Sequence, residues 1–391
     1  MKHKNLLIIL GLVLVWTLFF SIFQYFIWGM YKSEIITLQF IAGYMSFGGI
    51  IAYIIGGVIY EILKEKKYHI FIILPLILVI ISLFLLKNPN NIIIGIISLL
   101  SGFYYGMWMV LRNILVSNEI SNSSFSDTKI NGFVNIGFTS SIIIGSILGG
   151  YLSEVLNIKG AFFIIGLLGI GLLIGLFLEV KYFFSDNKNL FQKLIHFKSD
   201  FKLNFLNIGK KYFSIMFIPA IIITLVTILF QKVIEYNVTQ LGIALSSATF
   251  LLLYSAIGAI LGNIITMKLR GSRWIIFSII ISLFSLNIII FPLFMDNFFY
   301  TKVLVFTAGI LFGISFNLSE SYFLKQLSTE ENKSFGSSFY GMTTNIVMGI
   351  IMFIIFFLSM YFSYSVIFII IGICFLVIGF MPLLKFKKER L

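Results

Sequence analysis

The sequence is poor in the residues that build soluble and disulfide-linked proteins. Only 11% of its 391 residues are charged, whereas a soluble domain carries about 25%. It has one cysteine, Cys374, which can form no internal disulfide, and three histidines. Because so few charges cannot coat a water-soluble particle of this size, the composition excludes a soluble enzyme, a disordered protein and a disulfide-rich scaffold.

Sequence signals for metal, nucleotide and catalytic sites are also lacking. The histidines His3, His69 and His196 fall in predicted loops or tails, and no His, Cys, Asp and Glu cluster has the spacing of metal ligands. No G-x-x-x-x-G-K-[ST] loop occurs, so ATP does not drive the protein directly. We therefore expect no cofactor, no metal and no enzymatic activity. A membrane-embedded transferase or polymerase is the least favoured class.

Hydrophobic residues make up 59% of the chain and gather in long runs. A membrane helix needs about 20 mostly apolar residues. Twelve such runs occur, at 5–28, 38–63, 70–86, 92–117, 132–152, 161–182, 212–234, 243–268, 274–293, 303–323, 339–361 and 364–384. The first follows two lysines, as in a signal peptide, but it is longer than the apolar part of one, and we expect it to remain as a span. The prediction is an all-α membrane protein with twelve transmembrane helices.

The basic residues predict how the chain is oriented. With twelve spans both termini lie on one side of the membrane, and that side receives 22 of the 28 Lys and Arg residues. Five fall on the other side, and Arg112 lies within a span. The positive-inside rule then places both termini in the cytoplasm of a cell (plasma or inner) membrane. The net charge of +13 therefore reflects topology, and we expect no nucleic-acid partner.

The longest polar stretch, 183–211, divides the spans into six and six. Its lysines are interleaved with apolar side chains, which is typical of an amphipathic helix on the inner membrane face. We predict a six-helix bundle over 1–182, a basic cytoplasmic linker over 183–211 and a second six-helix bundle over 212–391. An offset of 207 aligns Gln24 with Gln231, Gly102 and Gly106 with Gly309 and Gly313, and Asn113 with Glu320. Such parallel repeats are related by a pseudo-two-fold axis along the membrane normal.

This organisation resembles the major facilitator superfamily over essentially the whole chain. The segment Gly56 to Glu61, followed by Lys64, Lys66 and Lys67, is similar to the family's signature after the second span. It has Glu61 where the family has Asp, and it lacks the internal Gly and Arg. The loop from Gly262 to Arg273 and the glycine-rich end of the fifth span are also similar. A multidrug and toxin extrusion transporter is another twelve-span fold with parallel halves, but these loops favour the facilitator family.

The resemblance implies a monomer that works by alternating access. It also implies that the first, fourth, seventh and tenth helices line the central cavity. In such a protein Glu61 would lie near the positive N-terminus of the eleventh helix, where the helix dipole stabilises a carboxylate. The resemblance therefore assigns Glu61 a gating role as a latch that holds the cytoplasmic side closed.

Ionisable side chains inside spans are functional candidates, because each costs about 2.5–3.5 kcal/mol to insert. Arg112 and Glu320 lie on cavity helices of opposite halves, and Glu320 shares a helical face with Gly309, Gly313 and Asn317. We expect Glu320 to carry a proton and to pair with Arg112 in one state of the cycle. A neighbouring cation favours the ionised carboxyl group, whereas burial without one favours the protonated form.

Two observations keep other interpretations of these charges open. Arg112 lies five residues from Ser117, so its side chain could reach the cytoplasmic interface. It also lies about 100° from the face of Gly106 on its helix. Glu320 could be a satisfied structural glutamate.

Polar and aromatic residues of the spans are candidate substrate contacts, namely Gln24, Tyr105, Trp108, Asn135, Gln231 and Asn317. Linings of this kind bind many small organic molecules without identifying one. We expect a proton-coupled secondary transporter of a small organic solute, with efflux favoured over uptake because the lining is aromatic and buried charge is sparse. The alternative is a lipid or lysolipid translocase of the same fold.

Two local contacts also follow from spacing. Lys232 and Glu235 are three residues apart on one helix, which favours a local ion pair. Small residues four apart let membrane helices approach closely. Such pairs are Gly102 with Gly106, Gly145 with Gly149, and Gly258 with Gly262.

Overall fold

The computed structural model describes residues 4–30, 43–60, 91–155, 217, 220–243, 245–268, 273–329 and 333–388. Within these residues every regular element is a helix, and no strand occurs. The predicted spans 70–86 and 161–182, the linker 183–211 and Glu61 lie outside the described residues.

Each of the other ten predicted spans coincides with a helix. In chain order they are α1 (Lys4–Met30), the helix Gly43–Tyr60, α3 (Asn91–Asn122), α4 (Asp127–Val155), the helix Ala220–Thr239, α7 (Leu245–Lys268), α8 (Arg273–Ile290) with the 3₁₀ turn η2 (Phe291–Leu293), α9 (Phe298–Ser328), α10 (Lys333–Ser359) and α11 (Tyr364–Lys388). Seven of the helices in the described residues are long and apolar enough to cross a membrane. In lipid the helix satisfies every backbone hydrogen bond within one segment.

Several helices are longer than the sequence predicted, and α3 and α9 are the longest of the described helices. α3 has 32 residues and α9 has 31, which at 1.5 Å per residue exceeds the roughly 30 Å of a bilayer core. Their last turns carry polar residues, such as Asn118 and Gln326, beyond the apolar run. Hydropathy therefore located the spans but missed the polar turns that extend α3 and α9 beyond them.

Local signals set several helix ends. The side chain of Asn297 accepts hydrogen bonds from the backbone N–H groups of Phe299 and Tyr300 and so caps the N-terminus of α9. Pro292 lies in η2, directly after α8. Gly242, in the turn before α7, has a φ of 64°, a conformation that side chains with a Cβ rarely adopt.

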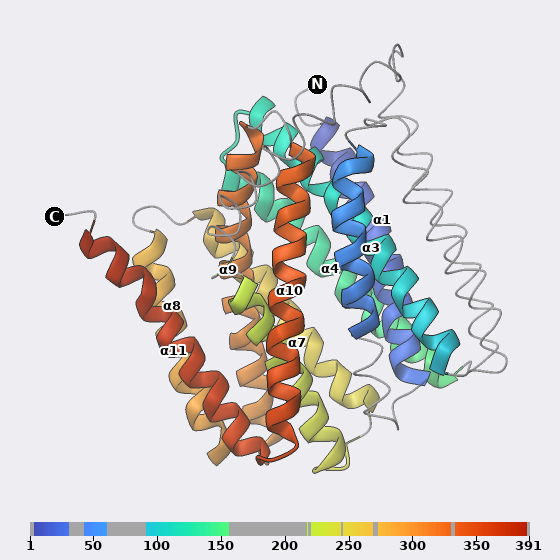
Figure 1. The fold of residues 1–391 in the computed structure, drawn as a ribbon. Coiled ribbons are helices and arrows are strands. Elements are labelled where there is room, and N and C mark those ends of the chain that lie inside the picture. The colour runs from blue at the N-terminus through green and yellow to red at the C-terminus, as the bar shows by residue number, and fades with distance from the viewer. Residues whose placement is uncertain are drawn as a thin grey trace.

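The described helices run side by side (Figure 1). Their buried apolar side chains form two clusters. One cluster is built mainly on α1, α3 and α4, and the other mainly on the helix Ala220–Thr239, α8, α9 and α11. The first cluster also includes Phe323, Leu324 and Leu327 of α9 and Phe339 and Tyr340 of α10. The two parts of the chain therefore meet where α3 and α9 end and where α4 and α10 begin. We call this region the closed end.

Glycines form close contacts between neighbouring helices, as their spacing predicted. A Cβ on Gly106 would lie 2.7 Å from the Cβ of Ala52, and one on Gly313 would overlap the carbonyl oxygen of Ala259. The pairs Ala52–Gly106 and Ala259–Gly313 differ by the offset of 207 at both positions. Equivalent helices thus pack in the same register in the two parts of the chain. Gly145 likewise packs on Ser21 of α1.

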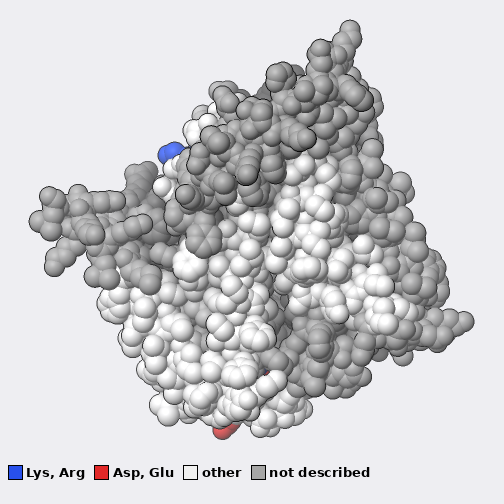
Figure 2. All heavy atoms as spheres, viewed as in Figure 1, with Lys and Arg blue, Asp and Glu red and all other residues white. Residues whose placement is uncertain are grey.

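The described surface carries little charge. Figure 2 shows one group of Lys or Arg atoms near its upper edge and one of Asp or Glu atoms at its lower edge, with mostly uncharged residues between them. Large apolar side chains such as Leu283 and Phe353 are exposed. In a chain with so many membrane-crossing helices, an exposed apolar surface is what lipid contact requires.

Candidate functional site

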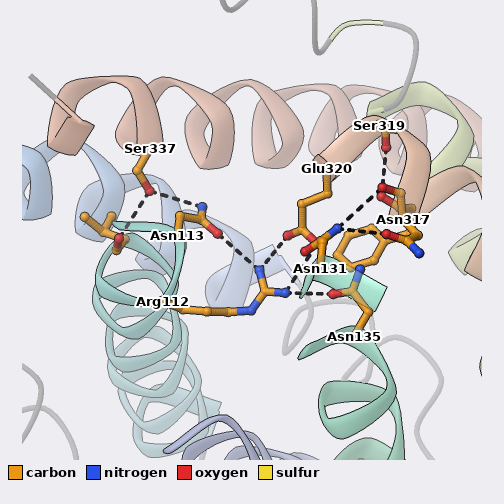
Figure 3. Close-up of polar contacts among 10 residues, drawn as sticks. Arg112, Asn113, Asn131, Asn135, Asn317, Ser319, Glu320 and Ser337 are labelled. Carbon is orange, nitrogen blue, oxygen red and sulfur yellow. Dashed lines mark hydrogen bonds and ion pairs between the residues drawn. The ribbon is translucent and has the colours of Figure 1, made fainter. Parts of the chain in front are cut away.

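Arg112 and Glu320 form an ion pair that joins α3 to α9 at the closed end (Figure 3). Nη1 of Arg112 donates to Oε1 of Glu320 at 2.5 Å, and Nη2 donates to Oε2 at 3.3 Å. Both side chains are 0% exposed. The predicted contact is therefore present, in the two-pronged geometry that matches a guanidinium to a carboxylate. In this structure the side chain of Arg112 therefore points to Glu320 and is not exposed.

Different faces of α3 carry the glycine contacts and the ion pair. Gly106 packs on Ala52 of the helix Gly43–Tyr60, whereas Arg112 reaches towards α4 and α9. The angle between the two residues on α3 is thus no obstacle, because each faces a different neighbour. On α9, Gly313 packs on α7, and seven residues further along, Glu320 meets α3.

Three further contacts, from residues of α3 and α4, hold the guanidinium group of Arg112. Nη2 of Arg112 donates to Oδ1 of Asn135 on α4 at 2.7 Å, and Nη1 donates to Oδ1 of Asn113 at 3.1 Å. The ring of Phe138 lies 5.6 Å from the Cζ atom of Arg112, within cation–π range. Arg112 is therefore anchored to α3 and α4 by neutral groups and to α9 by one charged group.

Neutral polar contacts join the same helices around the ion pair. Nδ2 of Asn113 donates to Oγ of Ser337 on α10 at 3.1 Å. Nδ2 of Asn131 on α4 donates to Oδ1 of Asn317 on α9 at 3.2 Å. These contacts connect α3 and α4 to α9 and α10 without using charge.

The first turns of α10 also contact α3 and the helix Gly43–Tyr60 at the closed end. Nζ of Lys333 donates to Oδ1 of Asn118 at 2.6 Å. Gly57 packs against Ser338, and Gly341 packs against the ring of Tyr53. Further along the same two helices, a Cβ on Gly43 or Gly349 would meet no described atom within 4 Å. The close glycine contacts between the two helices therefore gather towards the closed end.

Aromatic residues lie next to the ion pair on α3. The half-buried ring of Tyr105 stacks on Phe20 of α1 with centroids 4.4 Å apart. Trp108 is fully buried, and its ring lies 6.4 Å from that of Trp16. The Nε1 atoms of both tryptophans have no hydrogen-bond partner in the described part of the chain.

The other predicted substrate contacts separate into two groups. Asn135 and Asn317 belong to the polar contacts around Arg112. Gln24 and Gln231 are half-buried; Gln24 lies in the C-terminal part of α1, and Gln231 lies near the middle of the helix Ala220–Thr239. Among the described residues, no group of three or more His, Cys, Asp and Glu side chains could hold a metal ion.

Sequence reasoning did not identify Asn113, Asn118, Lys333 and Ser337 as site residues. A signal existed for Asn113, because the offset of 207 aligns it with Glu320. Polar serines and asparagines in membrane helices often bond to their own backbone. Their cross-helix partners depend on packing, and no sequence signal was available for Asn118, Lys333 and Ser337.

Lys232 and Glu235 form the predicted local ion pair, with Nζ and Oε2 2.9 Å apart. The hydroxyl of Tyr364 on α11 also donates to Oε1 of Glu235 at 2.8 Å, and Tyr236 donates to Asp296. These contacts link the helix Ala220–Thr239 to α11 and to the turn before α9. They lie among the helices of the second apolar cluster and do not reach α3 or α4.

Comparison with known proteins agrees with this architecture. Residues 127–327 match the family described as Major Facilitator Superfamily. No curated protein has a matching sequence. A variant of the Escherichia coli fucose:proton symporter FucP is similar, with a TM-score of 0.65 and 14% identity over 98% of this chain and 99% of that chain.

Two further solved structures are similar. FucP in the outward conformation gives a TM-score of 0.62 and 15% identity over 98% of this chain and 99% of that one. The proton:xylose symporter XylE bound to 6-bromo-6-deoxy-D-glucose gives a TM-score of 0.69 and 12% identity over 99% and 96%. At these identities the likeness concerns the fold, which is that of multi-pass helical membrane transporters. The family match covers more than half of the sequence, and the chain belongs to the Major Facilitator Superfamily of secondary transporters.

Proposed function

We propose that the protein is a proton-coupled secondary transporter that moves a small organic solute across the cell membrane by alternating access. The observation that carries the proposal is the fully buried ion pair between Arg112 of α3 and Glu320 of α9. It lies where the two parts of the chain meet, so it must break if that end is to open.

The cost of breaking the pair depends on protonation. Separating a buried ion pair leaves an uncompensated charge on each side, and removing one partner of such a pair costs about 3–5 kcal/mol. A protonated Glu320 carries no charge, so its separation from Arg112 is less costly. Arg112 stays anchored to Asn113 and Asn135. A proton on Glu320 would therefore favour opening of the closed end.

The orientation is part of the proposal. The distribution of Lys and Arg supports cytoplasmic termini, and the closed end contains the first turns of α1, so it would face the cytoplasm. Bundles over 1–182 and 212–391 would rock about a central site as a monomer. The two apolar clusters and the repeated Ala–Gly contacts support such a division.

The aromatic residues on α1 and α3 support an amphipathic substrate and, with it, efflux over uptake. The titles of FucP and XylE describe sugar–proton symporters, which supports coupling to protons. At 12% and 14% identity these neighbours do not transfer their substrates to this chain.

The test is proton flux in proteoliposomes that contain a pH-sensitive dye. Gradients of sugars, amino acids, organic acids, lipophilic cations and lysolipids are imposed one at a time. We expect one solute class to drive proton movement through the unmodified protein and through Glu235→Gln, a control that removes a carboxylate outside the site. Glu320→Gln should exchange the solute without moving protons.

Full pH dependence in Glu320→Gln would contradict the coupling role. Movement of lysolipids alone, without proton flux, would identify a lipid translocase instead.

A further inference from the structure

The charge on Arg112 needs a partner in every state of the transporter. This inference rests on the proposed function, in which Glu320 moves away with α9. Arg112 would then keep only the amide oxygens of Asn113 and Asn135 and the ring of Phe138. All three are neutral, and a buried charge without a counter-charge is costly.

Several hydrogen-bond donors at and around the guanidinium group of Arg112 are not used by the described residues. Nε of Arg112, Nδ2 of Asn135 and the hydroxyl of Tyr340 are buried and have no hydrogen-bond partner in the described part of the chain. The first two atoms can only donate. Among the described titratable groups that act on Arg112, Glu320 is the carboxylate, and Tyr105 and Tyr340 are phenols. Gly341, the residue after Tyr340, packs against the ring of Tyr53.

We propose that the substrate is an organic acid whose carboxylate takes the place of Glu320 on Arg112. In the present structure the charges of Arg112 and Glu320 cancel. With Glu320 protonated and a substrate carboxylate on Arg112, they cancel again. A neutral solute would leave one positive charge uncompensated, whereas an acid bearing one negative charge keeps the site neutral in both states.

The apolar part of the substrate would lie against α3 and α1. Tyr105 precedes Arg112 by seven residues, two helical turns, so both residues share one face of α3. Its half-buried ring stacks on Phe20. The substrate would then place its carboxylate on the guanidinium group of Arg112 and its aromatic or apolar part beside Tyr105. Such a molecule is an amphipathic organic acid. Acid and proton would move together, and net flux, efflux included, would follow their combined gradients.

The first test measures binding to the purified full-length protein in detergent, by thermal stabilisation and by titration. The probes are benzoate, the neutral benzamide of the same shape, and chloride. We expect benzoate to bind and benzamide and chloride to bind far more weakly. Glu320→Gln should tighten benzoate binding by about tenfold, because removing the competing carboxylate raises the fraction of protein with a free guanidinium. Arg112→Lys should weaken it, because lysine lacks the two-pronged fork.

A second measurement needs no variant. Benzenesulfonate stays ionised as the pH falls, so its affinity for the unmodified protein should rise as Glu320 becomes protonated. Equal binding of benzoate and benzamide, displacement of benzoate by equimolar chloride, or a benzoate affinity unchanged in Glu320→Gln would each overturn the inference. If Glu320→Gln abolishes proton coupling in liposomes while benzoate is not preferred, the proposed function stands and only this inference fails.

Discussion

Asn113 and Glu320 accept hydrogen bonds from the same nitrogen atom, Nη1 of Arg112, at 3.1 Å and 2.5 Å. They come from α3 and α9 and lie 207 positions apart, the offset that aligns the two parts of the chain. Equivalent positions of the repeat therefore meet at one guanidinium. The asparagine is a neutral contact that stays with Arg112, and the glutamate is a charged contact that a proton can weaken.

The ion pair should behave as a unit in stability measurements. We expect Arg112→Met or Glu320→Met alone to lower the free energy of unfolding by about 3–5 kcal/mol, because each leaves a buried charge without its partner. The double variant should recover most of this loss, because both charges are gone. Thermal unfolding of the four proteins in detergent checks this. Additive losses in the double variant would contradict a coupled pair.

Asn135 should contribute stability through Arg112. Asn135→Ala removes a 2.7 Å hydrogen bond from a charged donor, and bonds to charged groups contribute about 1.5–3 kcal/mol. The matched control is Asn263→Ala, because Asn263 is as deeply buried but donates to the carbonyl oxygen of Ala259 in its own helix. We expect the control to lose much less. Equal losses in thermal unfolding would mean that Asn135 acts only as packing.

The close contact of Gly313 with α7 should not tolerate a methyl group. A Cβ on Gly313 would overlap the carbonyl oxygen of Ala259, and overpacking of this kind costs about 1–3 kcal/mol. Gly349→Ala is the control, because a Cβ there meets no described atom within 4 Å. We expect Gly313→Ala to lower the melting temperature and Gly349→Ala to leave it nearly unchanged. The opposite order would show that α7 and α9 do not meet at Gly313.

The sequence was a good guide wherever lipid restricts the possibilities. Apolar runs located the ten spans that fall in the described residues, because only helices satisfy the backbone in lipid. Two charges too costly to leave alone in a membrane predicted the pair between Arg112 and Glu320. Spacing predicted the contact between Lys232 and Glu235, because one helix contains both residues.

The amides were harder to place. An asparagine in a span can bond to its own helix, as Asn263 does, or to another helix, as Asn131 does. The choice depends on which helices meet and at what height, which hydropathy does not contain. Asn135 was predicted as a substrate contact, and the bond that its Oδ1 accepts from Arg112 was not predicted.

The central claim is that the charge on Glu320 holds the closed end together, and disulfide formation across that end tests it most directly. Gly57→Cys and Ser338→Cys are introduced in a Cys374→Ser background, since Cys374 is the one native cysteine. A Cβ on Gly57 lies 3.1 Å from the Cβ of Ser338, close to the roughly 3.5–4.5 Å that a disulfide spans. The cross-linking rate is compared at one pH with Glu320 intact, with Glu320→Gln and with Glu235→Gln. The account predicts rapid cross-linking in the first and third proteins and a slower rate in Glu320→Gln, and equal rates in all three would contradict it.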